Sequence, residues 1–244
     1  MSEQKKDIII ESLISSFNDF FTGNADERLF LGITEDVGYL PMVSEDEHKE
    51  LITEGKKLLA RLQKFSRQNL SFDQKLDLEL AQLAVEQDLF FETYTINDKP
   101  NYKAMPAASL IGDGLFHIFS NDPRPSSERL DDITARLYDV PKYLLGHLKE
   151  LDAPVKRWVD IDIDVVNELP DLFNSISTWA EEEDYGNLNG LQRALEKAQA
   201  ALDDYVAQLR KFKTTNKFSI GAEQAKELVR LNGIDLSFEE MHVL

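Results

Sequence analysis

The sequence predicts an all-α protein, an elongated antiparallel bundle of about seven to nine helices that forms a single domain over residues 1–244. Apolar residues recur mostly at the three- and four-residue spacing of amphipathic helices, and almost no segment alternates as a half-buried strand would. Several helix starts also carry capping residues. With 244 residues, of which 42% are hydrophobic, the chain is long enough to bury a sizeable core.

Capping patterns place the first helices. Residues 1–28 are expected to form a loosely packed amino-terminal helix. Ser44 with Glu47, and Ser71 with Gln74, match the capping box, in which each side chain bonds to the backbone N–H of the other residue. The two helices that these pairs open are joined by the short stretch "SRQNL", which predicts a helical hairpin.

The next segment is predicted to be irregular. Residues 95–114 are rich in proline, glycine and asparagine, and they precede a short apolar helix, "LFHIF". Helical periodicity resumes at Ser127. Pro141 is expected to break or restart that helix, with Asp139 capping the second part, because proline lacks the N–H that a helix interior needs.

Two long helices are predicted to follow. Asp152 is expected to cap the first, with Pro154 in its first turn and a kink at Pro170. The second carries one apolar seam at three- and four-residue spacing: Leu188, Leu191, Leu195, Ala198, Leu202, Tyr205, Leu209 and Phe212. A seam this narrow is typical of a helix that packs between two neighbours.

The last residues, "IDLSFEEMHVL", form a complete helix start. Ser237 and Glu240 match a capping box, and Leu236 and Met241 occupy the two positions of a hydrophobic staple. A helix this short is marginal in water by itself. We therefore expect apolar cover or a docking partner near Leu236–Leu244.

Charge and composition exclude several classes of function. The 45 acidic and 27 basic residues give a formal net charge of -18, which repels nucleic acids and anionic membrane surfaces. The absence of cysteine excludes disulfides, thiolate metal sites and a cysteine nucleophile. The first residues contain neither a signal-peptide core nor a membrane span, so we expect a cytoplasmic protein with no membrane partner.

The inventory for a metal site is thin. The chain has four histidines and no H-E-x-x-H motif. Three pairs remain as weak candidates for metal ligands: Glu45 with His48, Glu239 with His242, and Asp113 with His117. The first two lie in the first turns of helices, where acidic residues serve the helix dipole, so we interpret them as solvated helix starts. His147 is expected on an exposed or boundary face, and no catalytic or cofactor-binding residue is assigned.

Several motifs occur together in a fixed order. An Arg-Leu-x-x-Val-Pro-x-Tyr-Leu segment is followed by long helices, a Phe-x-Ile-Gly stretch and a Leu-Ser-x-Glu-Glu helix start. The matching positions are Arg136, Leu137, Val140, Pro141, Tyr143 and Leu144, then Phe218, Ile220 and Gly221, then Leu236, Ser237, Glu239 and Glu240. Over residues 30–244, this pattern resembles the amino-terminal half of the bacterial domain-of-unknown-function 885 proteins.

The resemblance implies a function for a longer protein. Members of that family look like helical, zincin-type metallopeptidases with an H-E-x-x-H helix in their carboxy-terminal half, which this chain lacks. These residues would then form a non-catalytic wall of a peptide-binding cleft, and zinc would bind only with a carboxy-terminal half that docks near Leu236–Leu244. Two alternatives stay open: a freestanding helical binding or scaffold protein, and a metal-dependent enzyme that uses the E-x-x-H pairs.

Overall fold

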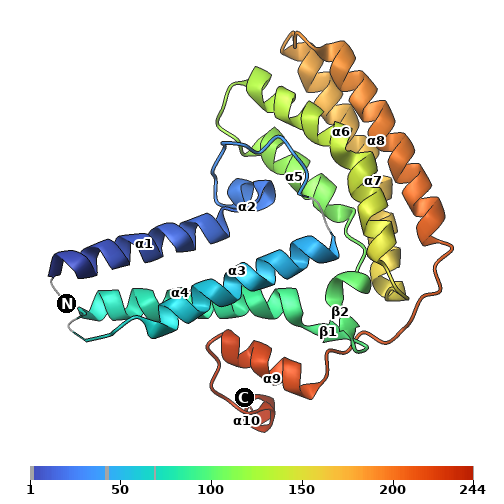
Figure 1. The fold of residues 1–244 in the computed structure, drawn as a ribbon. Helices are drawn as coiled ribbons and strands as arrows, with labels where there is room; N and C mark the ends of the chain where they lie inside the picture. Colours follow the sequence, from blue (N-terminus) through green and yellow to red (C-terminus); the bar gives the residue numbers. More distant parts are fainter. Residues whose placement is uncertain (1–2, 42–43, 69, 244) are drawn as a thin grey trace. The chain divides into compact units, whose positions relative to one another are not determined.

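The structure, a computed structural model, describes residues 3–41, 44–68 and 70–243 (Figure 1). Ten α-helices and one two-stranded hairpin lie within these ranges, which confirms the all-α prediction. The elements in chain order are α1 Glu3–Phe21, α2 Ala25–Phe30, α3 Glu45–Lys64, α4 Phe72–Thr93, β1 Thr95–Ile96, β2 Lys99–Pro100, the 3-10 turn η1 Asn101–Lys103, α5 Ser109–Ser120, α6 Ser126–Glu150, α7 Lys156–Glu182, α8 Leu188–Leu209, α9 Ala222–Leu231 and α10 Phe238–Val243.

The chain divides into two compact units, each made of separate segments. The first unit takes residues 1–20, 46–101 and 217–244, and the second takes residues 21–45 and 102–216. The first therefore contains most of α1, nearly all of α3, and α4, α9 and α10, while the second contains α2 and α5–α8. The prediction of a single domain stays a prediction.

The core of the second unit is built around α8. This helix packs against both α6 and α7, and α5 packs against the same two helices. The predicted seam of α8 faces inward: Leu191, Ala198, Leu202, Tyr205 and Leu209 are buried, and Leu188 and Leu195 are partly buried. The seam prediction is confirmed within α8, and its last member, Phe212, lies beyond the end of the helix but packs partly buried against the same core.

Pro141 does not interrupt its helix, contrary to the prediction. α6 runs without a break through Pro141, whose own side chain is exposed. Val140 and Tyr143, on either side of the proline, are buried in the core. This tertiary packing outweighs the roughly 3 kcal/mol that an interior proline costs a helix. Asp139 caps nothing in α6; its carboxylate accepts a hydrogen bond from the backbone N–H of Leu40 at 3.2 Å.

The predicted irregular segment at residues 95–114 is partly ordered. Strands β1 and β2 pair as an antiparallel hairpin. The turn between them consists of Asn97 and Asp98, both of which have positive φ. Helix α5 begins at Ser109 rather than at residue 115, because a carboxylate from another helix caps it: Asp162 of α7 accepts a bond from the Ser109 N–H at 3.2 Å. A cap supplied by tertiary structure leaves no local pattern in the sequence.

Asp152 does not cap α7, which is a second correction. The helix begins at Lys156 after Val155, and no side chain caps it. Backbone hydrogen bonds hold the chain before it instead, and this stretch turns at Ala153, which has a positive φ. The Asp152 N–H donates to the Lys103 carbonyl at 2.8 Å, and Val155 pairs with Thr215 as an isolated parallel bridge.

In the first unit, α3 and α4 form the predicted helical hairpin. Gln82 on α4 donates to the Leu62 carbonyl on α3 at 3.0 Å. Further along, a Cβ at Gly55 would come within 2.9 Å of the Leu89 side chain, so the glycine of α3 leaves room for this leucine of α4. α3 begins at Glu45, as predicted, and the capping box of Ser71 and Gln74 opens α4. The predicted amino-terminal helix is two helices, since α1 ends at Phe21 and Asn24 caps α2.

The seam of α8 generates a stability prediction. Leu202→Ala is expected to lower the free energy of unfolding by about 2–5 kcal/mol, because Leu202 is fully buried and its loss leaves a cavity. Leu195→Ala, at a partly buried position of the same seam, is the matched control and should cost less. Urea denaturation measures both values. Equal losses for the two variants would show that the seam is not the core of this unit.

Candidate functional site

Helix α9 is fastened along the second half of α4 by side chains at both of its ends. At its start, Gln224 accepts a hydrogen bond from the Thr95 N–H at 2.7 Å and donates to the Thr95 carbonyl at 3.1 Å. At its end, Gln87 of α4 donates to the Leu231 carbonyl at 2.6 Å, and Arg230 pairs with Glu86 at 3.0 Å. These contacts run in opposite senses along the two helices, so α9 is antiparallel to α4 (Figure 1).

Beyond α9 the chain forms α10 with little support from the rest of its unit. The predicted capping box is present: the Glu240 N–H donates to Ser237 Oγ at 3.2 Å, and the Ser237 N–H donates to the Glu240 carboxylate at 2.8 Å. The hydrogen bond from the Ser237 N–H to the carboxylate holds the pKa of Glu240 below its usual range. None of the residues of α10 is buried. The helix therefore has a complete amino-terminal cap, but its side chains are not buried against the rest of the unit.

Four apolar side chains of this segment face solvent and form what we call the carboxy-terminal apolar surface. It consists of Ile234, Leu236, Phe238 and Val243, whose exposed fractions are 42%, 41%, 37% and 85%. The predicted staple therefore gives little cover, since Leu236 stays exposed. Leu244, which belongs to the same predicted docking region, lies outside the described residues. Within the described residues these four side chains do not find the apolar cover that was one of the two expectations for this segment, and the docking partner stays a prediction.

A second exposed apolar feature lies on α4, in the half that α9 does not reach. Phe72, Leu76 and Leu80 are 78%, 42% and 55% exposed. They are four residues apart and so share one face of the helix. We call them the α4 stripe. The first unit thus carries apolar side chains in contact with water on both α4 and the carboxy-terminal segment.

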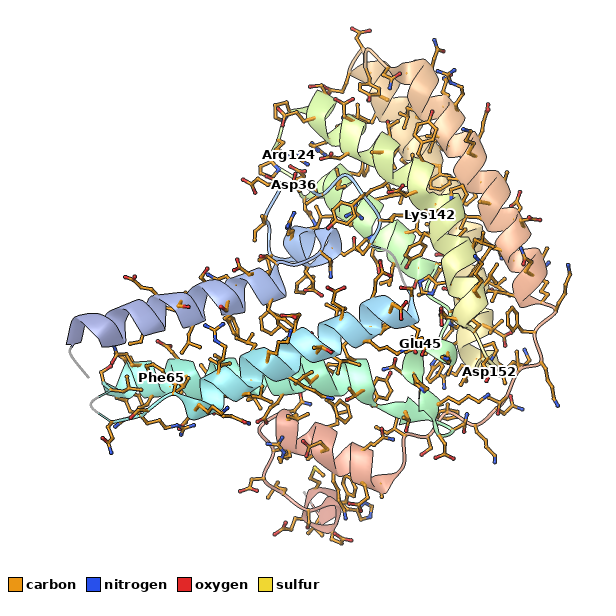
Figure 2. The ribbon with its side chains drawn as sticks, in the orientation of Figure 1. Asp36, Glu45, Phe65, Arg124, Lys142 and Asp152 are labelled. Carbon is orange, nitrogen blue, oxygen red and sulfur yellow. The ribbon has the colours of Figure 1, made fainter. Side chains whose placement is uncertain are left out.

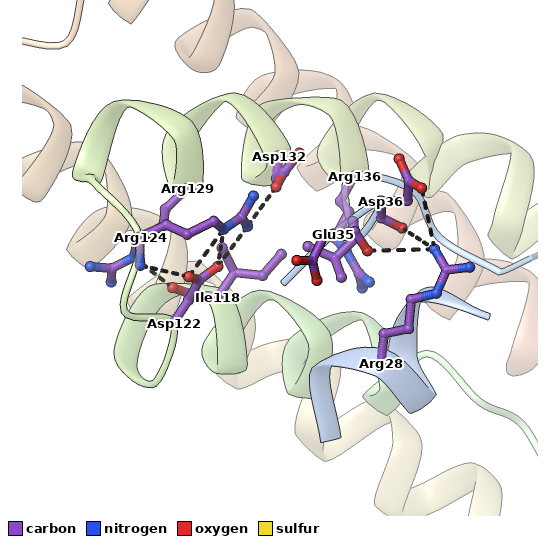
Figure 3. A network of polar contacts seen from close by, with 10 residues as sticks. Arg28, Glu35, Asp36, Ile118, Asp122, Arg124, Arg129, Asp132 and Arg136 are labelled. Atoms are coloured by element: carbon purple, nitrogen blue, oxygen red, sulfur yellow. Dashed lines mark hydrogen bonds and ion pairs between the residues drawn. The ribbon is translucent and has the colours of Figure 1, made fainter. Parts of the chain in front are cut away.

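The polar groups of the second unit mostly bind one another (Figure 3). Arg136 of α6, which is fully buried, donates to the Val37 carbonyl at 2.6 Å and to the Asp26 carboxylate at 2.7 Å. Arg124 bridges Asp122 and Asp132 at 2.6 and 2.7 Å. The predicted motif residue Arg136 therefore has a structural role, and the charges of this network are used within the fold.

A glycine makes room for the buried guanidinium. A Cβ at Gly114 of α5 would overlap with Nη1 of Arg136. The guanidinium cannot move aside easily, because Asp26 and Val37 already hold it. This explains why α5 contains a glycine at a position where alanine would favour the helix.

The two candidate metal ligands at the start of α3 each bind a different residue and not a common site. Glu45 pairs with Lys103 at 3.3 Å, and Figure 2 marks it at the first residue of the helix. His48, whose side chain is only 18% exposed, binds Glu92 of α4 at 2.7 Å through Nδ1. His48 is therefore less exposed than a solvated helix start would be, but its partner is a carboxylate that ties α3 to α4.

The other two candidate pairs give no cluster either. Asp113 is exposed, while His117 is half-buried and contacts Asn121 and the ring edge of Phe30. Glu239 and His242 are both exposed on α10. Across residues 3–41, 44–68 and 70–243, no three histidine, aspartate or glutamate side chains come together as a metal site would require.

Two buried polar groups were not identified from the sequence. Asp162 of α7 is 3% exposed; it accepts a bond from the Tyr205 hydroxyl at 2.9 Å and caps α5 through Ser109. Burial raises the pKa of this carboxyl, although the bonds from Tyr205 and the α5 backbone act in the opposite direction. His147, expected at an exposed or boundary position, is 4% exposed and packs against the Tyr143 ring. That expectation was wrong, because the helices packed on α6, chiefly α8 and α5, cover a wider face of it than its leucines indicate.

The comparisons with known proteins concern the family and the fold. A family model described as "Bacterial protein of unknown function (DUF885)" matches residues 26–244. No curated protein matches the chain. Among solved structures, a protein from Shewanella oneidensis described as "a putative lipoprotein of unknown function" shares the fold, with a TM-score of 0.69 and 16% sequence identity.

The match to the Shewanella oneidensis protein is uneven in length. It includes 93% of this chain but only 41% of that chain, so these residues span less than half of the related structure. In the described ranges of this chain, no helix has both the length and the apolar character that crossing a membrane requires.

The space at Gly114 generates a prediction. Gly114→Ala is expected to lower the free energy of unfolding by about 1–3 kcal/mol, because the new methyl group displaces Arg136 from its partners. Gly186→Ala is the control, since nothing lies within 4 Å of a Cβ built there, and it should stay within about 0.5 kcal/mol. Thermal or urea unfolding compares them. A stabilised Gly114→Ala variant would contradict the proposed role of the glycine.

The buried carboxyl of Asp162 generates a pH prediction. Its folded pKa lies above the unfolded value of about 4, so folding takes up a proton in the window between these values. The resulting stabilisation is complete below about pH 4 and is lost as the pH rises through the folded pKa. The stability of the native protein relative to Asp162→Asn should therefore fall as the pH rises above 4. Urea unfolding at a series of pH values tests this, and Asp164→Asn, an exposed carboxylate of α7, is the control.

Proposed function

The chain belongs to the DUF885 family of bacterial proteins of unknown function, and on this premise we propose that it is a non-catalytic helical region that docks against the rest of a longer assembly. The docking site is the carboxy-terminal apolar surface. The partner is a carboxy-terminal part that carries the H-E-x-x-H helix of a metallopeptidase-like protein, as a continuation of the chain or as a separate subunit. The helices of this chain then form the wall of its peptide-binding cleft.

One observation carries the proposal. Helix α10 has a complete capping box, yet none of its described side chains is buried, and Phe238 and Val243 remain exposed. A six-residue helix without tertiary packing is marginal. Several exposed apolar side chains within one short segment are a feature of surfaces that bind another protein segment. A partner that covers this surface would provide the packing that α10 lacks.

The remaining features are consistent with an incomplete assembly. The α4 stripe begins where the cover by α9 ends, so a docked helix could lie along α4 beyond α9. The related protein from Shewanella oneidensis is more than twice as long as the part that matches this chain. In that arrangement, zinc, the general base and the bond-breaking chemistry belong to the partner, and the peptide is the substrate of the whole. A cytoplasmic location remains part of this proposal.

Two other functions predict different results. A freestanding binding or scaffold protein would use the same apolar surface to hold a protein that has no H-E-x-x-H motif. A metal-dependent enzyme built on the E-x-x-H pairs would need Glu45 and His48, or Glu239 and His242, to share an ion. The first pair is occupied by Lys103 and Glu92 and the second is solvent-exposed, so neither pair favours that enzyme. Finding stoichiometric zinc, iron or manganese in the purified chain alone would support the metal-dependent enzyme.

The docking proposal predicts a complex. The chain is co-expressed with the polypeptide that is encoded next downstream, and the complex is measured by size-exclusion chromatography with zinc analysis. Phe238→Asp combined with Val243→Asp is expected to weaken the complex by about 30-fold or more, because losing a buried apolar anchor typically costs 2 kcal/mol or more. Phe116→Asp, on exposed α5 surface of the second unit, is the matched control and should have little effect.

Hydrogen exchange of the isolated chain supplies an independent test. The amides of Phe238–Val243 should exchange rapidly in the chain alone and slowly in the complex. Slow exchange at α10 in the isolated chain would contradict the proposal, because it would mean that the helix is already covered. A complex with a protein that lacks the H-E-x-x-H motif would favour the scaffold function instead.

A further inference from the structure

The first unit contains an apolar groove between α1, α3 and α4, which we call the α1–α3–α4 groove. Its volume is about 480 Å³, within the range of about 300–1,000 Å³ that is usual for small-molecule sites. Figure 2 marks one of its lining residues, Phe65, directly after α3. The lining is mostly apolar and includes Leu13, Ile14, Leu62, Leu78, Leu80 and Ala81.

The groove has a buried apolar floor and exposed apolar edges. Leu13, Leu62 and Leu78 are at most 8% exposed and belong to three different helices. At the edges, Ile14 of α1 and Leu80 of α4 are each 55% exposed. An aliphatic ligand that enters the groove would meet apolar side chains on all three helices and would cover these two edge residues.

The packing of the helices explains why the groove is open. Arg61 of α3 donates to Ser16 Oγ at 2.7 Å and to Ser12 Oγ at 3.2 Å, which ties α1 to α3. On the opposite wall, α4 presents Ala81 and Ala84, whose side chains are too short to fill the space. The groove therefore stays open for two reasons: the alanines of α4 are small, and the hydrogen bonds of Arg61 join α1 to α3 but not to α4.

The polar groups of the groove indicate which ligand charge it accepts. Among the lining residues that the structure describes, Asp77 is the one that carries a charge, and its side chain is exposed. In the described part of the chain, no hydrogen bond or ion pair reaches its carboxylate. Gln74 beside it already accepts from the Ser71 N–H through Oε1. A ligand carboxylate would meet repulsion from Asp77, whereas an ammonium group would meet an unpaired anion.

We propose that the α1–α3–α4 groove binds a linear alkylammonium, with the aliphatic chain on the leucine floor and the ammonium group at Asp77. Burial of the methylenes supplies most of the affinity, and the carboxylate selects the charge. The net charge of -18 adds a long-range preference for cations. This site does not rest on the docking function, because none of its lining residues belongs to the carboxy-terminal apolar surface.

The experiment uses alkylammonium ions of increasing length with the full chain. Octyl-, decyl- and dodecylammonium are titrated by calorimetry below their micelle concentrations. Affinity should rise about fourfold for each added methylene until the groove is full, with a stoichiometry of one. Dodecanol should bind about two- to fivefold more weakly than dodecylammonium, as expected for the loss of one exposed ion pair, and dodecanoate should bind more weakly still.

Four variants place the ligand. Ala81→Phe fills the groove and should abolish binding, whereas Ala207→Phe, on the exposed face of α8, should not. Asp77→Asn should reduce the affinity for dodecylammonium two- to fivefold and leave dodecanol unchanged. Asp73→Asn, an exposed carboxylate of the same helix outside the lining, is its control. Circular dichroism confirms that each variant is folded before its affinity is compared.

Three outcomes would overturn the proposal. The first is binding of dodecanoate as tight as that of dodecylammonium, which would remove the role of Asp77. The second is unchanged binding in a folded Ala81→Phe variant. The third is loss of binding in Phe238→Asp with Val243→Asp, which would place the ligand on the carboxy-terminal apolar surface. That last result would leave the docking function standing while removing the groove as a ligand site.

Discussion

The second unit depends on the burial of one guanidinium group. Arg136 is fully buried, and burying a charge is costly unless hydrogen bonds and an opposite charge compensate for it. Several features of the unit supply part of that compensation at Nε and Nη1, while Nη2 is buried without a hydrogen-bond partner among the described residues. Asp26, in the first turn of α2, provides the carboxylate, Val37 provides a carbonyl, and Gly114 leaves the space. Because these partners come from α2, a loop and α5, the single side chain on α6 joins three separate parts of the chain. The continuity of α6 through Pro141 rests on a different part of the core, since Val140 and Tyr143 are buried on either side of the proline.

Sequence patterns predicted the structure correctly where the residues that form an element lie a few positions apart in the chain. The seam of α8 and the capping boxes at Ser71 and Ser237 involve residues a few positions apart, and all three are present. The errors arose where a distant segment decides the outcome. α5 starts early because Asp162 reaches it from α7, 53 residues away in the sequence. The segment before α7 stays outside the helix, held by backbone bonds to Lys103 and Thr215. Neither contact leaves a periodic or capping pattern that could have been read in advance.

Surfaces were harder to predict than helices, for a related reason. An apolar surface near the last helix could be expected from a well-capped helix with few residues after its start. The α1–α3–α4 groove could not, because Leu62 and Leu78 have the same spacing as any core residue, and Ala81 and Ala84 have the composition of an ordinary helix. The groove depends on the distance between its helices. For α1 and α3, the hydrogen bonds from Arg61 to Ser12 and Ser16 help to set that distance. Such a tie joins side chains about 45 residues apart, and serine on a helix surface is usually solvated.

Leu80 connects the two proposed sites of the first unit. It lines the α1–α3–α4 groove and also belongs to the α4 stripe, the face along which a docked helix could extend beyond α9. An occupant of the groove that covers Leu80 removes apolar area that a docked partner would otherwise bury, and a partner that covers Leu80 narrows the entrance to the groove. Linkage requires such an effect to be reciprocal: if the ligand weakens docking, docking weakens the ligand by the same factor. Because one leucine carries the overlap, the coupling should be small, and it should disappear when Leu80 is replaced by alanine while Leu76 is left intact.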